Sequence, residues 1–107
     1  MIKNLPIGEV VNLAGLVGYQ EGQVVSRTLV QDDGVSLTLF AFPSGEGLTA
    51  HATPADALVY VLDGEAVIEI DGEASVVGAG ESIVMPSDVP HAVTAEQNFK
   101  MLLMIVK

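Results

Sequence analysis

The chain contains no cysteine among its 107 residues, and this absence removes several chemistries at once. Disulfide bridges, thiolate metal ligands and thiol nucleophiles are all excluded. A domain of this length can still bury a hydrophobic core without covalent cross-links. We therefore predict a single domain, and the lack of cysteine agrees with a cytoplasmic location.

Positive charge is scarce, because four Lys and Arg residues stand against 14 Asp and Glu, for a formal net charge of −10. A surface of this charge repels the phosphate backbone of nucleic acids and anionic membrane headgroups. No apolar run approaches the roughly 18 residues of a membrane-spanning helix. The N-terminal segment, interrupted by Pro6 and Gly8, lacks the apolar core of a signal peptide. We expect no nucleic-acid partner and no membrane partner.

Aromatic residues make up only 5% of the chain and tryptophan is absent, whereas half of the residues are hydrophobic. From Gln23 onward the apolar residues recur with a period of two, which indicates β-strands separated by glycine-rich and proline-rich turns. We predict an all-β barrel over residues 23–107, preceded by an N-terminal arm over residues 1–22 that supports at most a short helix. The predicted strands cover residues 24–31, 35–42, 48–51, 57–62, 66–71, 74–77, 82–85, 91–96 and 99–106.

Two Asp-Gly pairs, Asp63-Gly64 and Asp71-Gly72, carry the strongest hairpin signals in the chain. Glycine at such a position adopts a positive φ without strain. The two pairs predict that the strands 57–62, 66–71 and 74–77 form a meander of neighbouring antiparallel strands.

The segments 58–62 and 101–106 are apolar at almost every position, so both faces of these strands should be covered. One face would point into the barrel, and the N-terminal arm or a second subunit would cover the other. We predict a homodimer with the arm as the candidate exchanged element. Tyr60 lies on the face opposite Val59 and Val61, which favours a role at the subunit interface over a catalytic one.

The only two histidines, His51 and His91, each follow a glycine at fixed spacing. These surroundings resemble the two motifs of the cupin superfamily. The first reads Gly45-x5-His51-x-Thr53 and continues to Gly64; the second reads Gly80-x5-Pro86-x-Asp88-x2-His91. The resemblance runs from about Val24 to Val106. It implies a double-stranded β-helix, a jelly-roll barrel whose family metal is held by inward-facing side chains from both motifs.

The resemblance carries over only half of the family's metal ligands. His51 and His91 match the first and last histidines, whereas Thr53 replaces the second histidine and Ala57 replaces the glutamate. A neutral hydroxyl is a weak ligand for a transition metal, and alanine offers none. Asp56 stands one residue from the glutamate position, and a one-residue slip turns a strand side chain to the opposite face unless a bulge re-aims it.

We interpret the chain as a small-molecule-binding barrel that holds one divalent transition metal weakly, Zn, Ni, Mn, Fe or Cu, through His51 and His91. Thr53, Phe40 and Met85 are the candidate ligand-pocket residues. An alternative is a metal-dependent dioxygenase, isomerase or decarboxylase acting on a small organic acid, with Thr53 or Asp56 completing the metal shell. A third reading is a structural or sensing barrel whose histidines are tied into internal hydrogen bonds.

Overall fold

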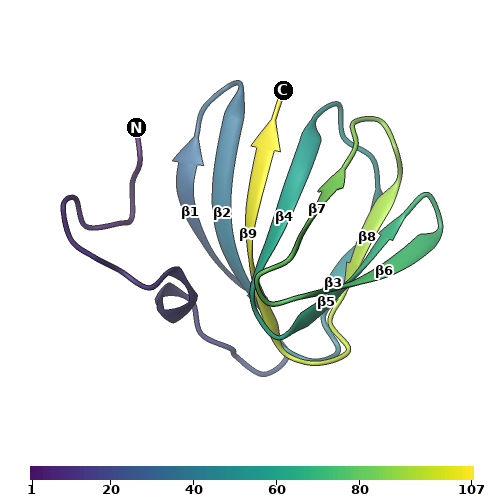
Figure 1. Cartoon of the computed structure of the whole chain (residues 1–107), viewed down its shortest axis with the longest axis horizontal. Helices are drawn as coiled ribbons and strands as arrows, with labels where there is room; N and C mark the ends of the chain where they lie inside the picture. Colours follow the sequence, from purple (N-terminus) through teal and green to yellow (C-terminus); the bar gives the residue numbers. More distant parts are fainter.

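Nine antiparallel strands form two sheets that enclose a hydrophobic interior, as the computed structural model of residues 1–107 shows (Figure 1). The strands are β1 (Val25–Gln31), β2 (Val35–Phe42), β3 (Gly47–His51), β4 (Asp56–Asp63), β5 (Glu65–Ile70), β6 (Glu73–Gly78), β7 (Ser82–Met85), β8 (His91–Thr94) and β9 (Phe99–Val106). One sheet has the order β1-β2-β9-β4-β7 and the other β3-β8-β5-β6. The predicted all-β barrel is confirmed, and all nine predicted strands are present.

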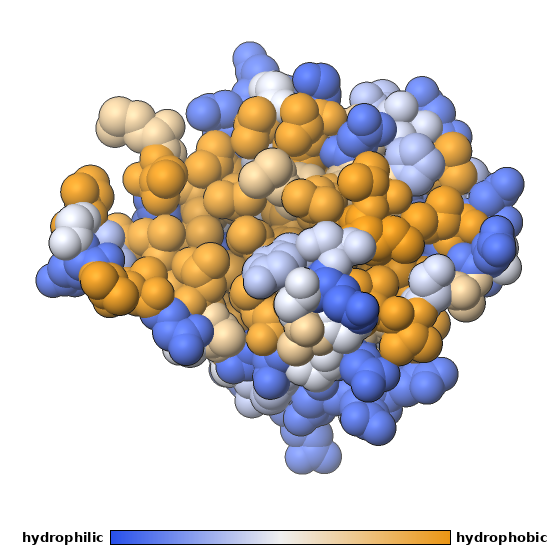
Figure 2. All heavy atoms as spheres, viewed as in Figure 1, coloured by the Kyte–Doolittle hydropathy of each residue, from blue (hydrophilic) through white to orange (hydrophobic).

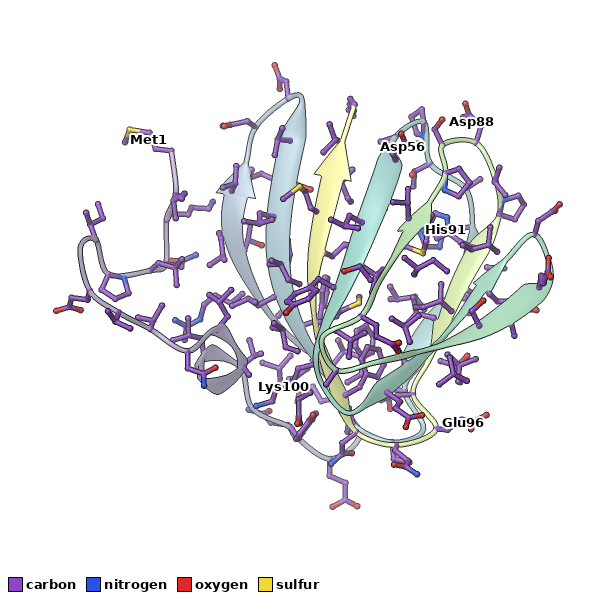
Figure 3. The ribbon with its side chains drawn as sticks, in the orientation of Figure 1. Met1, Asp56, Asp88, His91, Glu96 and Lys100 are labelled. Atoms are coloured by element: carbon purple, nitrogen blue, oxygen red, sulfur yellow. The ribbon has the colours of Figure 1, made fainter.

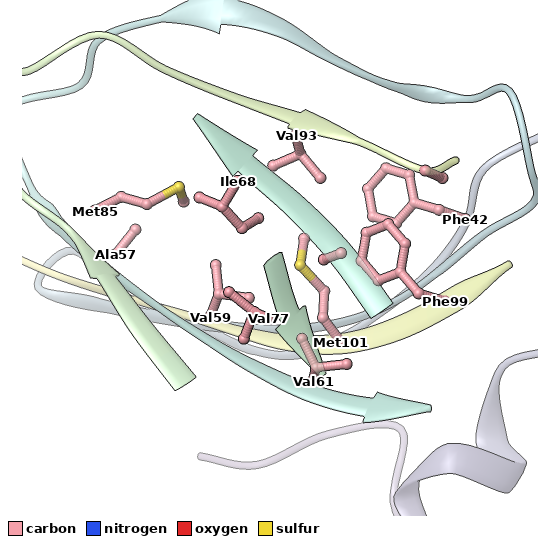
Figure 4. Close-up of a cluster of buried hydrophobic side chains, with 12 residues drawn as sticks. Phe42, Ala57, Val59, Val61, Ile68, Val77, Met85, Val93, Phe99 and Met101 are labelled. Atoms are coloured by element: carbon pink, nitrogen blue, oxygen red, sulfur yellow. The ribbon is translucent and has the colours of Figure 1, made fainter. Parts of the chain in front are cut away.

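Alternation along the strands determines which side chains fill the barrel. On β4, Ala57, Val59 and Val61 are buried while the residues between them are more exposed. They belong to a cluster of twelve buried residues that both sheets contribute (Figure 4). The stacked rings of Phe42 and Phe99, 4.8 Å between centroids, fill one end of this cluster. Figure 4 shows Ala57 and Met85 at the other end, so the core extends along the whole barrel.

The predicted meander of three strands is wrong in its first half. β5 pairs with β6 through the Asp71-Gly72 turn, as predicted, and both turn residues have positive φ. β4, however, pairs with β9 and β7 in the other sheet and forms no ladder with β5. The Asp63-Gly64 pair is therefore a corner at which the chain changes sheets. Asp63-Gly64 carries the same turn signal as Asp71-Gly72, but the second ladder partner of β5 is β8 and not β4.

The N-terminal arm packs against the outer face of the five-stranded sheet. Its only helix, the 3-10 turn η1 (Leu13–Leu16), begins after Asn12, whose side chain accepts a hydrogen bond from the backbone N–H of Ala14. Val17 of the arm forms a second buried cluster with Leu29, Leu39 and Ala41 of β1 and β2. The arm thus covers part of the outer apolar face, one of the two covers expected from the sequence. No helix of the chain has the length and hydrophobicity needed to span a bilayer.

A polar clamp holds the end of the arm on the sheet. The hydroxyl of Tyr19 donates a hydrogen bond of 2.5 Å to a carboxylate oxygen of Asp63. The Lys100 ammonium lies 5.0 Å from the centre of the Tyr19 ring and donates to the carbonyl oxygen of Ala14. Partial burial, the hydrogen bond to Asp63 and the charge of that carboxylate raise the pKa of Tyr19 well above its usual range.

This clamp predicts an alkaline loss of stability. Tyr19→Phe is expected to lower the free energy of unfolding by about 1 kcal/mol at neutral pH, because one hydrogen bond is lost. Above about pH 10 the unfolded tyrosine loses its proton while the folded one keeps it, so the wild-type advantage declines as pH rises further. Urea unfolding of the wild type and of Tyr19→Phe, between neutral pH and pH 11, measures the difference in their free energies of unfolding. A wild-type advantage that stays constant over this range would contradict the prediction.

Candidate functional site

The two histidines lie side by side between strands β3 and β8. His51 and His91 are partners in the antiparallel ladder, and their ring centroids are 4.5 Å apart with the planes nearly edge to face. His91 is 4% exposed and follows the inward alternation of Val93, whereas His51 is exposed because β3 is an edge strand. The structure therefore brings the two predicted metal ligands together. Figure 3 shows His91 at the same end of the barrel as Asp56 and Asp88.

The loop before His91 is fixed by contacts to the connection between β3 and β4. The backbone N–H of Asp88 donates to the carbonyl oxygen of Thr53 at 2.7 Å, and that of Ser87 donates to the Asp56 carboxylate at 2.9 Å. Asp88 has a φ of 62°, a left-handed conformation that aspartate adopts more readily than most residues. Together with the rigid rings of Pro86 and Pro90, these bonds set where β8 begins.

Both imidazole rings use Nδ1 in a local hydrogen bond. Nδ1 of His51 lies 2.9 Å from the carbonyl oxygen of Thr49, and Nδ1 of His91 lies 3.2 Å from that of Val89. A carbonyl oxygen only accepts, so each Nδ1 carries the proton that it donates. In the neutral rings Nε2 is therefore unprotonated, and its lone pair is available to a metal ion or to a donor group of a ligand.

The positions that would complete a four-ligand metal shell are not filled by strong ligands. Ala57 points into the core opposite Met85, and its methyl group offers no donor atom. The half-buried Thr53 has its hydroxyl directed toward the carbonyl oxygen of Ala55, at 3.4 Å. Asp56 is exposed, and the register of β4 along β9 is regular from Asp56 to Val61, with its one shift between Val61 and Asp63, so no bulge in this ladder turns Asp56 inward. No group of three His, Cys, Asp or Glu side chains is placed to hold a metal ion.

The three predicted pocket residues occupy different surroundings. Phe40 is half-buried and packs against Phe42, with 5.6 Å between ring centroids. Met85 is buried in the core beside Ala57. Thr53 lines a cavity of about 380 Å³ that contains neither histidine. The three residues therefore do not line one common pocket in the structure.

This cavity, the largest in the protein, lies between the β1–β2 turn, the connection after His51 and the end of β9. Gln31, Ser36, Ile105 and Lys107 line it together with Thr53. Sequence reasoning missed these four residues because they come from three separate segments and belong to no motif. The pairing of Ser36 with Ile105, which brings two of these residues to one face, is given only by the register of β2 along β9 in the structure.

Positive charge is almost absent from the site. Arg27 lies in register with Leu39 on the outer sheet face and donates to the carbonyl oxygen of Asn4. Lys100 belongs to the clamp of the arm, and Lys107 is the one cation beside the largest cavity. The histidine pair thus lies in a strongly acidic protein, a setting that attracts cations and repels anions.

Comparison with known proteins places this fold among solved barrels. The cupin domain family model matches residues 38–107. A conserved protein of unknown function from Streptococcus pyogenes is 40% identical, with a TM-score of 0.96 over 99% of this chain and 93% of that one. A cupin superfamily protein from Desulfitobacterium hafniense is 34% identical, with a TM-score of 0.94 over 99% of this chain and 97% of that one.

A third similar structure belongs to a longer protein. A cupin 2 conserved barrel domain protein from Leptotrichia buccalis is 51% identical over 91% of this chain, with a TM-score of 0.89. The chain spans only 47% of the length of that protein. No curated protein matches the chain.

Proposed function

This chain belongs to the cupin family, and from that premise we propose that it binds a small polar molecule beside a weakly held divalent metal ion at His51 and His91. The observation that carries the proposal is that the two adjacent rings make the same kind of hydrogen bond through Nδ1. Each Nδ1 is engaged by a backbone carbonyl oxygen, which leaves two neighbouring Nε2 lone pairs available. Metal-binding histidines are oriented by this kind of hydrogen bond on the other ring nitrogen.

Two imidazoles without a carboxylate fit a weak site for Zn, Ni, Mn, Fe or Cu, and do not fit a closed four-ligand centre. Remaining coordination positions would be open to water or to the small molecule. When bound, such an ion polarises an oxygen or nitrogen atom of its ligand as a Lewis acid. The chain's own contribution is to orient the two rings and to shield His91 from solvent.

The cavity that Thr53 lines, two residues after His51 in the chain, supports a small polar ligand. Its volume of about 380 Å³ falls within the range of small-molecule sites, roughly 300–1,000 Å³. Gln31, Ser36 and Thr53 offer hydrogen-bonding groups, and Lys107 is the only cation. The proposal stops at binding, because the usual non-haem iron oxygenase site needs a third, carboxylate ligand that this chain does not place beside the histidines.

The test is metal-dependent stability. A metal that binds only the folded protein, at a hundred times its dissociation constant, raises the free energy of unfolding by about 2.7 kcal/mol. We expect at least one of the five metals to do so in the wild type and to have almost no effect in His51→Ala. His51 is the better position for substitution because it is exposed, so its removal leaves no cavity in the core. Elemental analysis of both proteins, purified without chelator, provides a second measurement.

Asp56→Asn is the matched control. It removes the carboxylate that accepts from the backbone N–H of Ser87, while an amide oxygen remains in its place to accept the same hydrogen bond. Metal binding should be unchanged, because Asp56 faces away from the barrel interior. Loss of binding in this variant would give Asp56 the ligand role that we assign to the histidines. If none of the five metals stabilises the wild type, metal binding at His51 and His91 is refuted, and the two histidines act only as hydrogen-bonding groups.

A further inference from the structure

Two connections between the sheets run side by side at one end of the barrel, which we call the mouth. The first leads from His51 at the end of β3 to Asp56 at the start of β4. The second leads from Met85 at the end of β7 to His91 at the start of β8. The backbone and side-chain hydrogen bonds described above join the two connections. The residues at their ends are therefore brought to one place.

Two ladder pairs face each other across the mouth. His51 and His91 are partners in the four-stranded sheet, and Ala57 and Met85 are partners in the five-stranded sheet. The two pairs are linked by the chain, because Ala57 comes six positions after His51 and His91 comes six positions after Met85. Alanine offers no donor atom. Met85 is therefore the residue of the second pair that brings a metal-binding atom, its Sγ, to the mouth.

The side chain of Met85 is directed into the interior beside His91. Met85 is 3% exposed and His91 is 4% exposed. Figure 4 shows Met85 extending toward Ile68 across the interior, and both belong to the same buried cluster. Ile70 follows Ile68 by two residues on the same face of β5, and Ile70 is the ladder partner of His91. Met85 and His91 therefore border the same part of the interior.

Met85 provides the only sulfur atom at the mouth. The chain has no cysteine and four methionines, one of which is the first residue of the arm. Met104 is the ladder partner of Leu58 on the outer face of the five-stranded sheet. Met101 is buried, but it pairs with β4 at Val61, four residues or roughly 13 Å along the strand from Ala57.

Two imidazoles and a thioether form a soft ligand set without charge. Thioether sulfur selects Cu(I), and imidazole also suits copper, whereas manganese prefers carboxylate and carbonyl oxygen. Zinc sites are completed by thiolate, imidazole or carboxylate groups, and the mouth adds none of these to the histidine pair. Burial favours an ion of single charge, because the cost of removing an ion from water rises steeply with its charge. These donors therefore fit Cu(I) better than a divalent ion.

The surface around the mouth favours the approach of a cation. Figure 3 shows Asp56 and Asp88 at this end of the barrel, near His91. Figure 2, drawn from the same side, shows hydrophilic residues along this edge of the molecule, in contrast to the broad hydrophobic area over the five-stranded sheet. Exposed carboxylates near the mouth raise the local concentration of cations without acting as ligands.

Building on the metal site proposed above at His51 and His91, we propose that this site takes copper in its monovalent state, Cu(I), and that Met85 is the third protein ligand. Nε2 of each histidine and Sγ of Met85 supply the three donor atoms. The thioether determines the preference for Cu(I) over the divalent ions, and the histidine pair alone accounts for the weaker binding of those ions.

Anaerobic titration of Cu(I) against the coloured chelator bicinchoninate tests the role of Met85. Met85→Leu keeps a similar apolar volume and removes the sulfur, so the fold should be retained, and thermal unfolding of the metal-free protein checks this. We expect Met85→Leu to bind Cu(I) at least about tenfold more weakly than the wild type and Zn(II) equally well. X-ray absorption at the copper edge should show copper–sulfur scattering in the wild type and none in Met85→Leu.

Met101→Leu is the matched control. It makes the same substitution in the same core, away from the mouth, and should bind Cu(I) as the wild type does. His51→Ala should lose Cu(I) and Zn(II) together, because both ions need the histidine pair.

Four outcomes would overturn the proposal. Equal Cu(I) affinity in the wild type and Met85→Leu, without copper–sulfur scattering, would remove Met85 from the site and leave the histidine site intact. An equal loss in Met101→Leu would attribute the effect to core packing. Stabilisation of the wild type by Zn(II) or Ni(II) but not by Cu(I) would refute the copper preference alone. If no metal stabilises the wild type, the site at the histidines and this inference fail together.

Discussion

A Gly64→Ala variant is expected to lose about 3–5 kcal/mol of its free energy of unfolding, a large part of the 5–15 kcal/mol typical of a domain. Two independent destabilising effects combine at Gly64, the corner where the chain passes from β4 to β5. Gly64 has a φ of 71°, which an alanine adopts only with strain. A β-carbon there would lie 2.2 Å from the carbonyl oxygen of Asn98, so the backbone before β9 would have to move.

Gly72→Ala separates these two costs. Gly72 has a φ of 81°, but a β-carbon there meets nothing within 4 Å. This variant should lose only about 1–2 kcal/mol, the cost of the left-handed conformation alone. Urea unfolding of both variants measures the difference. Equal losses in the two would show that the approach to Asn98 relaxes without cost, which would contradict our account of the corner.

Phe99→Ala is expected to cost about 3–5 kcal/mol, as large aromatic truncations in cores do. The Phe99 ring is fully buried and stacked on Phe42, at the end of the core opposite Met85. Removing this ring from the packed interior would leave a cavity. Thermal or urea unfolding measures the loss.

Phe40→Ala is the comparison for this prediction. Phe40 lies on the same face of β2 as Phe42 but is only half-buried, so its removal should cost about 1–2 kcal/mol. Similar losses of unfolding free energy in Phe40→Ala and Phe99→Ala would mean that the stacked Phe99 ring contributes no more to stability than the half-buried Phe40 ring. Phe40→Ala also tests the predicted pocket, because a change in ligand binding with little loss of stability would support its role there.

The strands and the pairing of the histidines could be predicted because both depend on local patterns. Alternation with a period of two, or an apolar run between turn residues, marks a strand, and all nine strands appear where these patterns predict them. The motif spacing around His51 and His91 led to the expectation that they meet, and they occupy paired positions. Their environments could not be predicted, because burial of His91 and exposure of His51 depend on which strand ends at a sheet edge.

The sequence by itself determined the all-β class, the positions of the strands and the acidic surface, because each follows from composition or short-range spacing. The incomplete ligand set followed from the resemblance of the sequence to the cupin motifs. Only the tertiary structure decided that Asp71-Gly72 closes a hairpin while Asp63-Gly64 turns a corner between sheets. The two dipeptides are identical, and both glycines have positive φ. The difference arises from the strands that follow: β6 has β5 as its ladder partner, whereas β5 pairs with β8, more than twenty residues further along the chain.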